Sequence, residues 1–199
     1  MVLPNQLTVA RIILTPVFMY LFLSEDVVLK QISIVVFVIA AITDWYDGWL
    51  ARKFNYITNW GKFLDPLADK ILTSAAFVSF VMIDVYSGWM VVLIISRDFI
   101  ITGLRLYAEY AGWSFSTSVL AKWKTFIQMA FLYYTLMLFT LKTIEPVYSA
   151  YPEIIDILLH PDLIYICMLL ITILTVWTGA TYIFKNIYSL KNQFKINAK

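Results

Sequence analysis

Four aspartates stand in two closely spaced pairs, and they are the residues of this sequence best suited to chemistry. The first pair is Asp44 and Asp47, and the second is Asp65 and Asp69. Such a set offers only oxygen ligands, which hard divalent cations prefer. The pattern therefore indicates Mg²⁺, Mn²⁺ or Ca²⁺ rather than zinc.

The spacing within each pair predicts that its two carboxylates share a helix face. Asp44 and Asp47 are spaced i, i+3, and Asp65 and Asp69 are spaced i, i+4. A short connection makes the two helices antiparallel neighbours, so the acidic faces can meet. Each carboxylate near hydrocarbon costs about 2.5–3.5 kcal/mol, and four together repel one another. Single aspartates could cap helices or pair with lysines, but two divalent cations account better for the whole set.

Small residues accompany both pairs. Gly48 and Ala51 follow the first pair, and Gly61 precedes the second. They could simply allow close helix packing, or they could admit a flat ligand ring and a diphosphate beside the carboxylates. Pro66 has two interpretations as well. It suits a first helical turn, but in a helix that begins near Gly61 it would weaken the backbone hydrogen bonding beside Asp65.

Composition indicates that membrane-spanning helices position these residues. Of 199 residues, 61% are hydrophobic and 14% are charged, whereas soluble domains have roughly 45–50% apolar and about 25% charged residues. Several stretches reach the roughly 20 apolar residues that a spanning helix needs. We expect an all-α polytopic membrane domain over residues 1–190 and a polar cytoplasmic tail over 191–199. The six expected spans are Leu7–Leu23, Leu29–Ala51, Trp60–Ile83, Gly88–Tyr107, Leu120–Leu141 and Leu163–Tyr188.

The distribution of lysine and arginine predicts the orientation of these spans. On one side of the expected bundle, the helix ends hold only two basic residues, Lys30 and Lys142. The longest break in the apolar pattern, Glu145–Asp162, lies on the same side. The positive-inside bias therefore places both termini and the aspartate pairs on the cytoplasmic side. The basic residues of that side are Arg11, Arg52, Lys53, Lys62, Arg105, Lys122, Lys124, Lys185, Lys191, Lys195 and Lys199.

A second group of polar residues lies on the fourth span and just beyond it. Arg97 and Asp98 stand inside an apolar stretch, where ionisable residues are costly and usually functional. A buried structural pair is the alternative interpretation. Arg105 forms a basic patch with Lys122 and Lys124 across the next connection. Such a patch suits a phosphate group, because the planar fork of arginine matches phosphate oxygens.

The aspartate region resembles the signature of the CDP-alcohol phosphatidyltransferases. That signature is D-x-x-D-G-x-x-A-R, a spacer of about eight residues, and then G-x-x-x-D-x-x-x-D. The matching residues are Asp44, Asp47, Gly48, Ala51, Arg52, Gly61, Asp65 and Asp69. The resemblance implies a homodimer with six spans. It also implies two Mg²⁺ (or Mn²⁺) ions per site, held by the four aspartates on the diphosphate of a CDP-lipid.

The resemblance assigns further roles. Asp69 would also remove the proton of the acceptor hydroxyl. The CDP-lipid would contact Asn5, Thr8, Gly48, Ala51, Arg52 and Gly61. Outside the family context, Asn5 and Thr8 could equally cap the first helix.

Looser motifs resemble the phosphatidylglycerophosphate synthase branch of that family. They are P-N-x-L-T-x-x-R at the N-terminus, S-R-D-x-x-x-x-G-L-R on the fourth span and K-x-K-T on the fifth. This branch transfers a phosphatidyl group from CDP-diacylglycerol to sn-glycerol 3-phosphate and releases CMP. The expected acceptor-phosphate ligands are Arg97, Arg105, Lys122 and Lys124.

Three other functions remain open from the sequence. A cardiolipin synthase or an inositol-phosphate transferase would share the aspartate signature. A cation transporter could use an acidic intramembrane site, but transporters often show repeated halves, and this sequence has no internal repeat. We expect a cell-membrane location, with the active site facing the cytoplasm, membrane lipids as partners and no nucleic-acid partner.

Overall fold

The computed structural model describes residues 3–54, 59–112 and 119–197, and within these ranges every regular element is a helix. This confirms the prediction of an all-α chain. The helices are α1 (Leu3–Phe22), α2 (Val27–Phe54), α3 (Asn59–Met82), α4 (Gly88–Tyr110), α5 (Val119–Thr143), α6 (Glu145–Ala150), α7 (Pro152–Leu158) and α8 (Pro161–Asn197).

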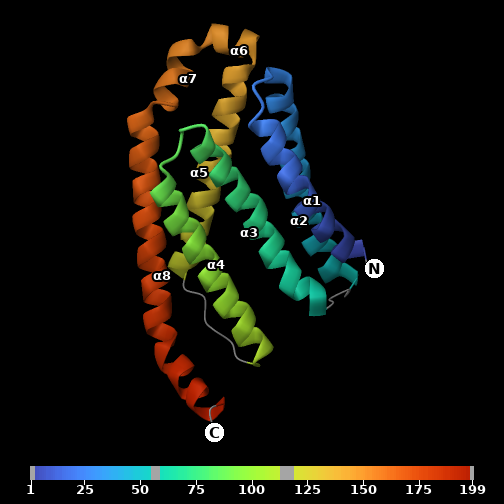
Figure 1. The fold of residues 1–199 in the computed structure, drawn as a ribbon, viewed down its shortest axis with the longest axis vertical. Coiled ribbons are helices and arrows are strands. Elements are labelled where there is room, and N and C mark those ends of the chain that lie inside the picture. The colour runs from blue at the N-terminus through green and yellow to red at the C-terminus, as the bar shows by residue number, and fades with distance from the viewer. Residues whose placement is uncertain (1–2, 55–58, 113–118, 198–199) are drawn as a thin grey trace.

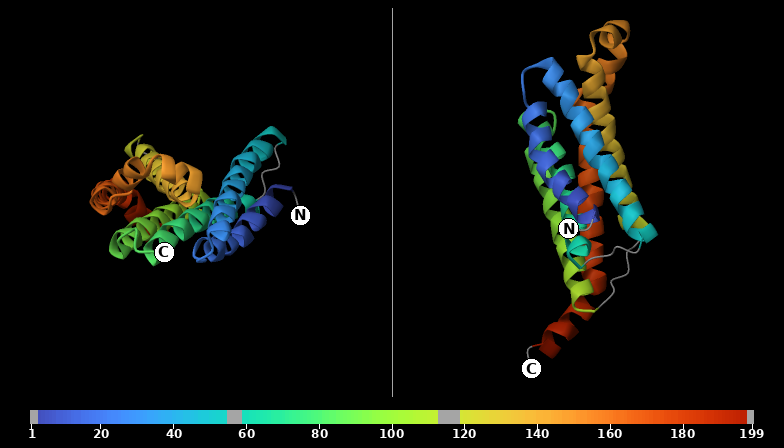
Figure 2. Two further views of the ribbon diagram at one scale, coloured as in Figure 1. Left: turned by 90° about the horizontal axis from the view of Figure 1, so that it is seen from above. Right: turned by 90° about the vertical axis from the view of Figure 1, so that its right-hand side faces the viewer.

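The long helices run side by side in an elongated bundle (Figures 1 and 2). Helix α1 packs against α2 and α3, α3 packs against α4, and α8 packs against both α4 and α5. Helices α6 and α7 lie at the end opposite the C-terminus (Figure 1). Most of the candidate site residues lie toward the other end of the bundle. This end contains the N-terminal part of α3, the C-terminal part of α4 and the N-terminal part of α5.

The helices have the apolar character of a membrane protein. Val119–Thr143 and the stretch Pro152–Asn186, which comprises α7 and most of α8, are long and apolar enough to cross a bilayer. Leu7–Phe22 and Val27–Thr43 are shorter apolar helices. Large hydrophobic side chains are exposed on the outer faces, such as Leu170, which is 61% exposed. Such faces suit contact with lipid better than contact with water.

The break at residues 145–162 differs from its expected form, because it contains two short helices. Each of these helices starts with a proline in its first turn, Pro146 in α6 and Pro152 in α7. Proline is well tolerated there, since the first backbone N–H groups of a helix have no intrahelical partner. Helix α8 likewise begins at Pro161, and it continues past residue 190 to Asn197. The expected division at residue 190 stays a prediction.

Aromatic side chains fill the core toward the α3–α4 turn. Phe80 and Tyr86 are buried with their ring centroids 4.8 Å apart. The Tyr86 hydroxyl donates a hydrogen bond to Thr135 Oγ1 on α5 at 2.8 Å. These contacts hold α3, α4 and α5 together at one end, so the polar residues at the other end stand on a fixed framework.

Candidate functional site

A cavity of about 600 Å³ lies between α3, α4, α5 and α8. Its wall is rich in charge, and four of its six charged side chains are basic. Apolar side chains such as Ile101 and Phe126 complete the wall. The charged lining residues are Asp69 and Lys70 from α3, Arg97, Asp98 and Arg105 from α4, and Lys122 from α5.

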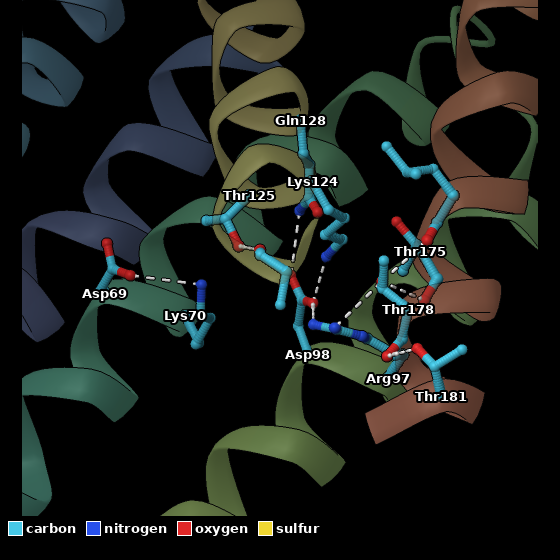
Figure 3. A network of polar contacts seen from close by, with 12 residues as sticks. Asp69, Lys70, Arg97, Asp98, Lys124, Thr125, Gln128, Thr175, Thr178 and Thr181 are labelled. Atoms are coloured by element: carbon cyan, nitrogen blue, oxygen red, sulfur yellow. Dashed lines mark hydrogen bonds and ion pairs between the residues drawn. The ribbon is translucent and has the colours of Figure 1, made fainter. Parts of the chain in front are cut away.

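Asp69 opens onto this cavity beside Lys70. The side chain of Asp69 is 37% exposed, and its Oδ2 lies 3.5 Å from Lys70 Nζ (Figure 3). Thr73 lies one turn further along α3, and its hydroxyl donates a hydrogen bond to the backbone carbonyl of Asp69 at 3.0 Å. Asp69 is therefore an accessible carboxylate with a cation beside it.

Asp65 lies one helical turn before Asp69 and is held from α1. The buried Thr8 hydroxyl donates a hydrogen bond to Asp65 Oδ1 at 2.5 Å. Helix α3 starts at Asn59, so Pro66 lies inside the helix rather than in its first turn. The second interpretation of Pro66 therefore applies, in which the missing N–H weakens the helix next to Asp65.

Asp98 is the centre of a buried ionic cluster between α4 and α5. Its Oδ1 accepts hydrogen bonds from Lys124 Nζ at 2.5 Å and from Arg97 Nη1 at 3.1 Å. Its Oδ2 accepts one from Gln128 Nε2 at 3.2 Å. The Lys124 side chain is fully buried. Because a buried charge must be paired, Asp98 fixes both cations, and the three ionic groups together keep one excess positive charge.

Arg97 has a second anchor on α8. Its Nη2 donates a hydrogen bond to Thr178 Oγ1 at 3.2 Å, and the Thr178 hydroxyl itself donates to the carbonyl of Leu174 at 2.8 Å. Figure 3 shows the guanidinium between the Asp98 carboxylate and α8. Arg97 thus links the charged cluster to α8 at the cavity wall.

Three of the four expected acceptor ligands meet at the cavity. Arg97, Arg105 and Lys122 line it, and the last two are exposed. Lys124 lies behind the wall with its ammonium on Asp98. A direct contact of Lys124 with an acceptor stays a prediction, while its role in holding Asp98 is a feature of the structure.

The remaining expected residues lie on described helices, but their side chains fall outside the described part of the structure. Asp44 and Asp47 belong to the C-terminal half of α2. The others are Asn5 on α1, Gly48, Ala51 and Arg52 on α2, and Gly61 on α3. Among the described residues, no three acidic, histidine or cysteine side chains are grouped so that they could hold a metal ion. Asp65 and Asp69 offer only carboxylate oxygens, a donor chemistry that fits a hard divalent cation.

Three polar residues of this region did not stand out as site residues in the sequence. Lys70 directly follows Asp69, Gln128 comes one helical turn after Lys124, and Thr178 lies in the apolar stretch of α8. A glutamine four residues after a lysine inside an apolar helix is a usable signal, because both side chains share a face. Thr178 gives no such signal, since threonine often bonds its own helix backbone.

Comparison with known proteins identifies relatives along most of the chain. Residues 1–184 match the family model described as CDP-alcohol phosphatidyltransferase. A Bacillus subtilis protein is 45% identical over 139 residues, which cover 64% of this chain and 72% of the relative. A Rickettsia typhi protein is 40% identical over 127 residues, covering 64% and 71%. A Salmonella typhimurium protein is 40% identical over 136 residues, covering 65% and 74%. All three relatives are named CDP-diacylglycerol–glycerol-3-phosphate 3-phosphatidyltransferase.

Proposed function

Because the chain belongs to the CDP-alcohol phosphatidyltransferase family, we propose that it transfers a phosphatidyl group from CDP-diacylglycerol to sn-glycerol 3-phosphate. The products are phosphatidylglycerophosphate and CMP, so the reaction belongs to phospholipid biosynthesis. The names of the relatives support this choice of substrates. Family membership confirms the resemblance that the aspartate motif indicated.

The charge of the cavity is the observation that carries the choice of acceptor. Four basic and two acidic side chains line it, and the buried Lys124 adds a further cation behind the wall. An acceptor that carries a phosphate would meet repulsion from the diphosphate of the CDP-lipid. A separate cationic surface offsets that repulsion, and arginine forms paired hydrogen bonds with phosphate oxygens. Arg97, Arg105 and Lys122 form this surface in the proposal.

The family generally uses a divalent metal. We propose two Mg²⁺ (or Mn²⁺) ions per site, with Asp44, Asp47, Asp65 and Asp69 as the residues that would hold them. When bound, such ions supply positive charge against a diphosphate leaving group. The oxygen-only chemistry of Asp65 and Asp69 supports this assignment.

Asp69 is the proposed proton acceptor. Its carboxylate opens onto the cavity, and Lys70 Nζ lies 3.5 Å from its Oδ2. The acceptor hydroxyl gives its proton to Asp69 while its oxygen forms a bond to the phosphorus of the phosphatidyl group. The bond between that phosphorus and the bridging oxygen breaks, and the electron pair leaves with CMP.

Family membership also supports proposals for the lipid contacts, the membrane topology and the assembly. Asn5, Thr8, Gly48, Ala51, Arg52 and Gly61 would contact the CDP-lipid. Six spans would place both termini and the active site on the cytoplasmic side of the cell membrane. The assembly would be a homodimer among membrane lipids.

The decisive experiment measures CMP release by purified protein from CDP-diacylglycerol and Mg²⁺, with acceptors supplied one at a time. Glycerol 3-phosphate should give the largest kcat/KM. A preference for inositol phosphate, which the basic cavity would also suit, or for phosphatidylglycerol would change the branch and keep the aspartate chemistry. No CMP release with any acceptor would remove the enzymatic proposal and favour a cation-transport function.

A further inference from the structure

Helix α8 approaches Arg97 most closely at a glycine. A Cβ atom added to Gly179 would lie 2.9 Å from Arg97 Cγ and 3.3 Å from its Nε. Carbon atoms in proteins pack at about 3.5–4.0 Å. Any residue larger than glycine at position 179 would therefore displace the arginine side chain or α8 itself.

Arg97 has little freedom to move away from such a contact. The collision falls on Cγ, near the backbone, while the far end of the side chain is bonded to Asp98 and to Thr178. Asp98 is in turn fixed by Lys124 and Gln128 on α5. A change at Gly179 would thus shift the guanidinium against a cluster that three helices hold in place.

The guanidinium position matters because of the charge it carries into the cavity. Arg97 and Lys124 share the single carboxylate of Asp98, and of the two cations only Arg97 lines the cavity. A partly buried charge interacts more strongly with a ligand than one in water does, and a hydrogen bond to phosphate depends steeply on distance and angle. A displacement of a few tenths of an ångström therefore weakens a paired arginine–phosphate contact.

We propose that Gly179 and Thr178 of α8 are positioning residues that place the Arg97 guanidinium for the phosphate group of the acceptor. Gly179 provides the space for the arginine stem, and Thr178 accepts a hydrogen bond from its Nη2. The proposal rests on the proposed function, since it concerns the acceptor of that reaction. It assigns to α8 a part in acceptor binding that the sequence motifs leave to α4 and α5.

The first test compares Gly179→Ala with Gly103→Ala. Both replace a helical glycine by the strongest helix former, and a Cβ at Gly103 meets nothing within 4 Å. Gly179→Ala should raise the KM for glycerol 3-phosphate about tenfold, with kcat and the KM for CDP-diacylglycerol changed less than about twofold. Gly103→Ala should leave all three close to wild type. Equal acceptor KM values in the two variants would overturn the proposal.

The second test uses two threonines of α8. Thr178 and Thr172 are both buried, and each donates its hydroxyl proton to the carbonyl four residues earlier, but only Thr178 also accepts from Arg97. Thr178→Val should raise the acceptor KM about three- to tenfold, and Thr178→Ser should restore it. Thr172→Val should leave it unchanged. This comparison also decides the matter if Gly179→Ala fails to fold.

A double-mutant cycle tests whether Gly179 acts through Arg97. Arg97→Ala should be tolerated, because Asp98 keeps Lys124 and Gln128 as partners. If Gly179 acts through the arginine, Gly179→Ala has no further effect on the acceptor KM in the Arg97→Ala background. Multiplicative effects of the two changes would show that Gly179 acts on packing elsewhere and would refute the proposal.

The proposal and the function it rests on fail in different ways. If wild-type protein does not use glycerol 3-phosphate, the proposed function fails and the positioning role falls with it. If wild-type protein uses glycerol 3-phosphate and Gly179→Ala matches Gly103→Ala, only the role of α8 fails. A second readout is the thermal stabilisation of the purified protein by glycerol 3-phosphate with Mg²⁺, which should be smaller for Gly179→Ala than for wild type.

Discussion

The Oγ1 of Thr8 on α1 donates a hydrogen bond to Oδ1 of Asp65 on α3, with 2.5 Å between the two oxygens. The two residues are 57 positions apart in the chain. A hydrogen bond to a carboxylate is worth about 1.5–3 kcal/mol, more than a neutral one. The first helix therefore sets the orientation of a carboxylate that we propose as a metal ligand. In the proposed site, the N-terminal half of α1 would support Asp65 as well as the CDP-lipid.

Thr8→Val should consequently weaken the proposed metal binding while the fold persists. Valine keeps the shape of threonine and removes the hydroxyl, so Asp65 loses its donor. The Mg²⁺ concentration for half-maximal turnover should rise about three- to tenfold, and Thr8→Ser should restore it. Thr15→Val is the control, because the buried Thr15 hydroxyl donates to the carbonyl of Arg11 on its own helix. An unchanged Mg²⁺ requirement in Thr8→Val would show that this hydrogen bond does not tune the site.

Replacing each of the four aspartates by asparagine should abolish turnover of the folded protein. Asparagine keeps the shape and loses the charge that binds Mg²⁺. Asp69→Asn should keep more affinity for metal and CDP-lipid than the others if its main role is proton removal. Chelation of divalent ions should stop wild-type turnover in the same assay.

The control for this series is Asp84→Asn. Asp84 lies in the turn between α3 and α4 with φ of 58°, a conformation that both aspartate and asparagine tolerate. The Asp84→Asn variant should keep wild-type activity. Wild-type-like turnover by any one of the four site variants, with metal present, would falsify the four-carboxylate assignment.

The positions of the long helices along the chain could be predicted from the sequence, because a spanning helix requires a long apolar stretch that few other elements contain. Each expected span overlaps one of the long helices α1–α5 and α8, with ends that agree within one residue where a span runs past its helix. The short helices α6 and α7 could not be predicted in the same way. They are too short for a length criterion. A proline such as Pro146 or Pro152 fits a turn as well as the first turn of a helix, so it does not distinguish the two.

The candidate site shows a similar division. The spacing of Asp65 and Asp69 on one helix face follows from helical periodicity, which is local. Asp98 has a local partner, its neighbour Arg97, which the sequence offered as a buried pair. Its second cationic partner is not local, since Lys124 lies 26 residues away on another helix. A basic residue near a cavity looks the same in a sequence whether it contacts a ligand or a buried carboxylate. Gly179 could not have been singled out either, because its role depends on the path of the Arg97 side chain.

The proposed orientation predicts which helix connections a reagent outside the cell can reach. Cys167 is the single cysteine of the chain, so single-cysteine variants can be built on Cys167→Ser. A membrane-impermeant thiol reagent on intact cells should label Ser149→Cys, since Ser149 is exposed on α6. Asn55→Cys and Lys191→Cys should react only after the cells are opened. The reverse pattern would invert the orientation and contradict the positive-inside interpretation.

The last prediction concerns Arg105 and Lys122, the two exposed basic residues of the cavity wall. Arg105→Ala and Lys122→Ala should each raise the KM for glycerol 3-phosphate roughly ten- to a hundredfold, because each loses a charge-assisted contact of about 1.5–3 kcal/mol. The KM for CDP-diacylglycerol should change much less, since we propose that this substrate binds at the aspartates. Lys142→Ala is the control: Lys142 lies at the opposite end of α5, where it pairs with Asp156 at 2.8 Å.

Glycerol, which lacks the phosphate, separates a loss of charge recognition from a general loss of activity. If Arg105 and Lys122 bind the phosphate, their removal should lower kcat/KM for glycerol 3-phosphate and leave kcat/KM for glycerol in the same assay nearly unchanged. Equal losses for both acceptors would mean that these residues support the fold or the chemistry instead. Loss of CDP-diacylglycerol affinity with normal acceptor affinity would place the basic surface on the other substrate, and the cavity would then hold the CDP-lipid.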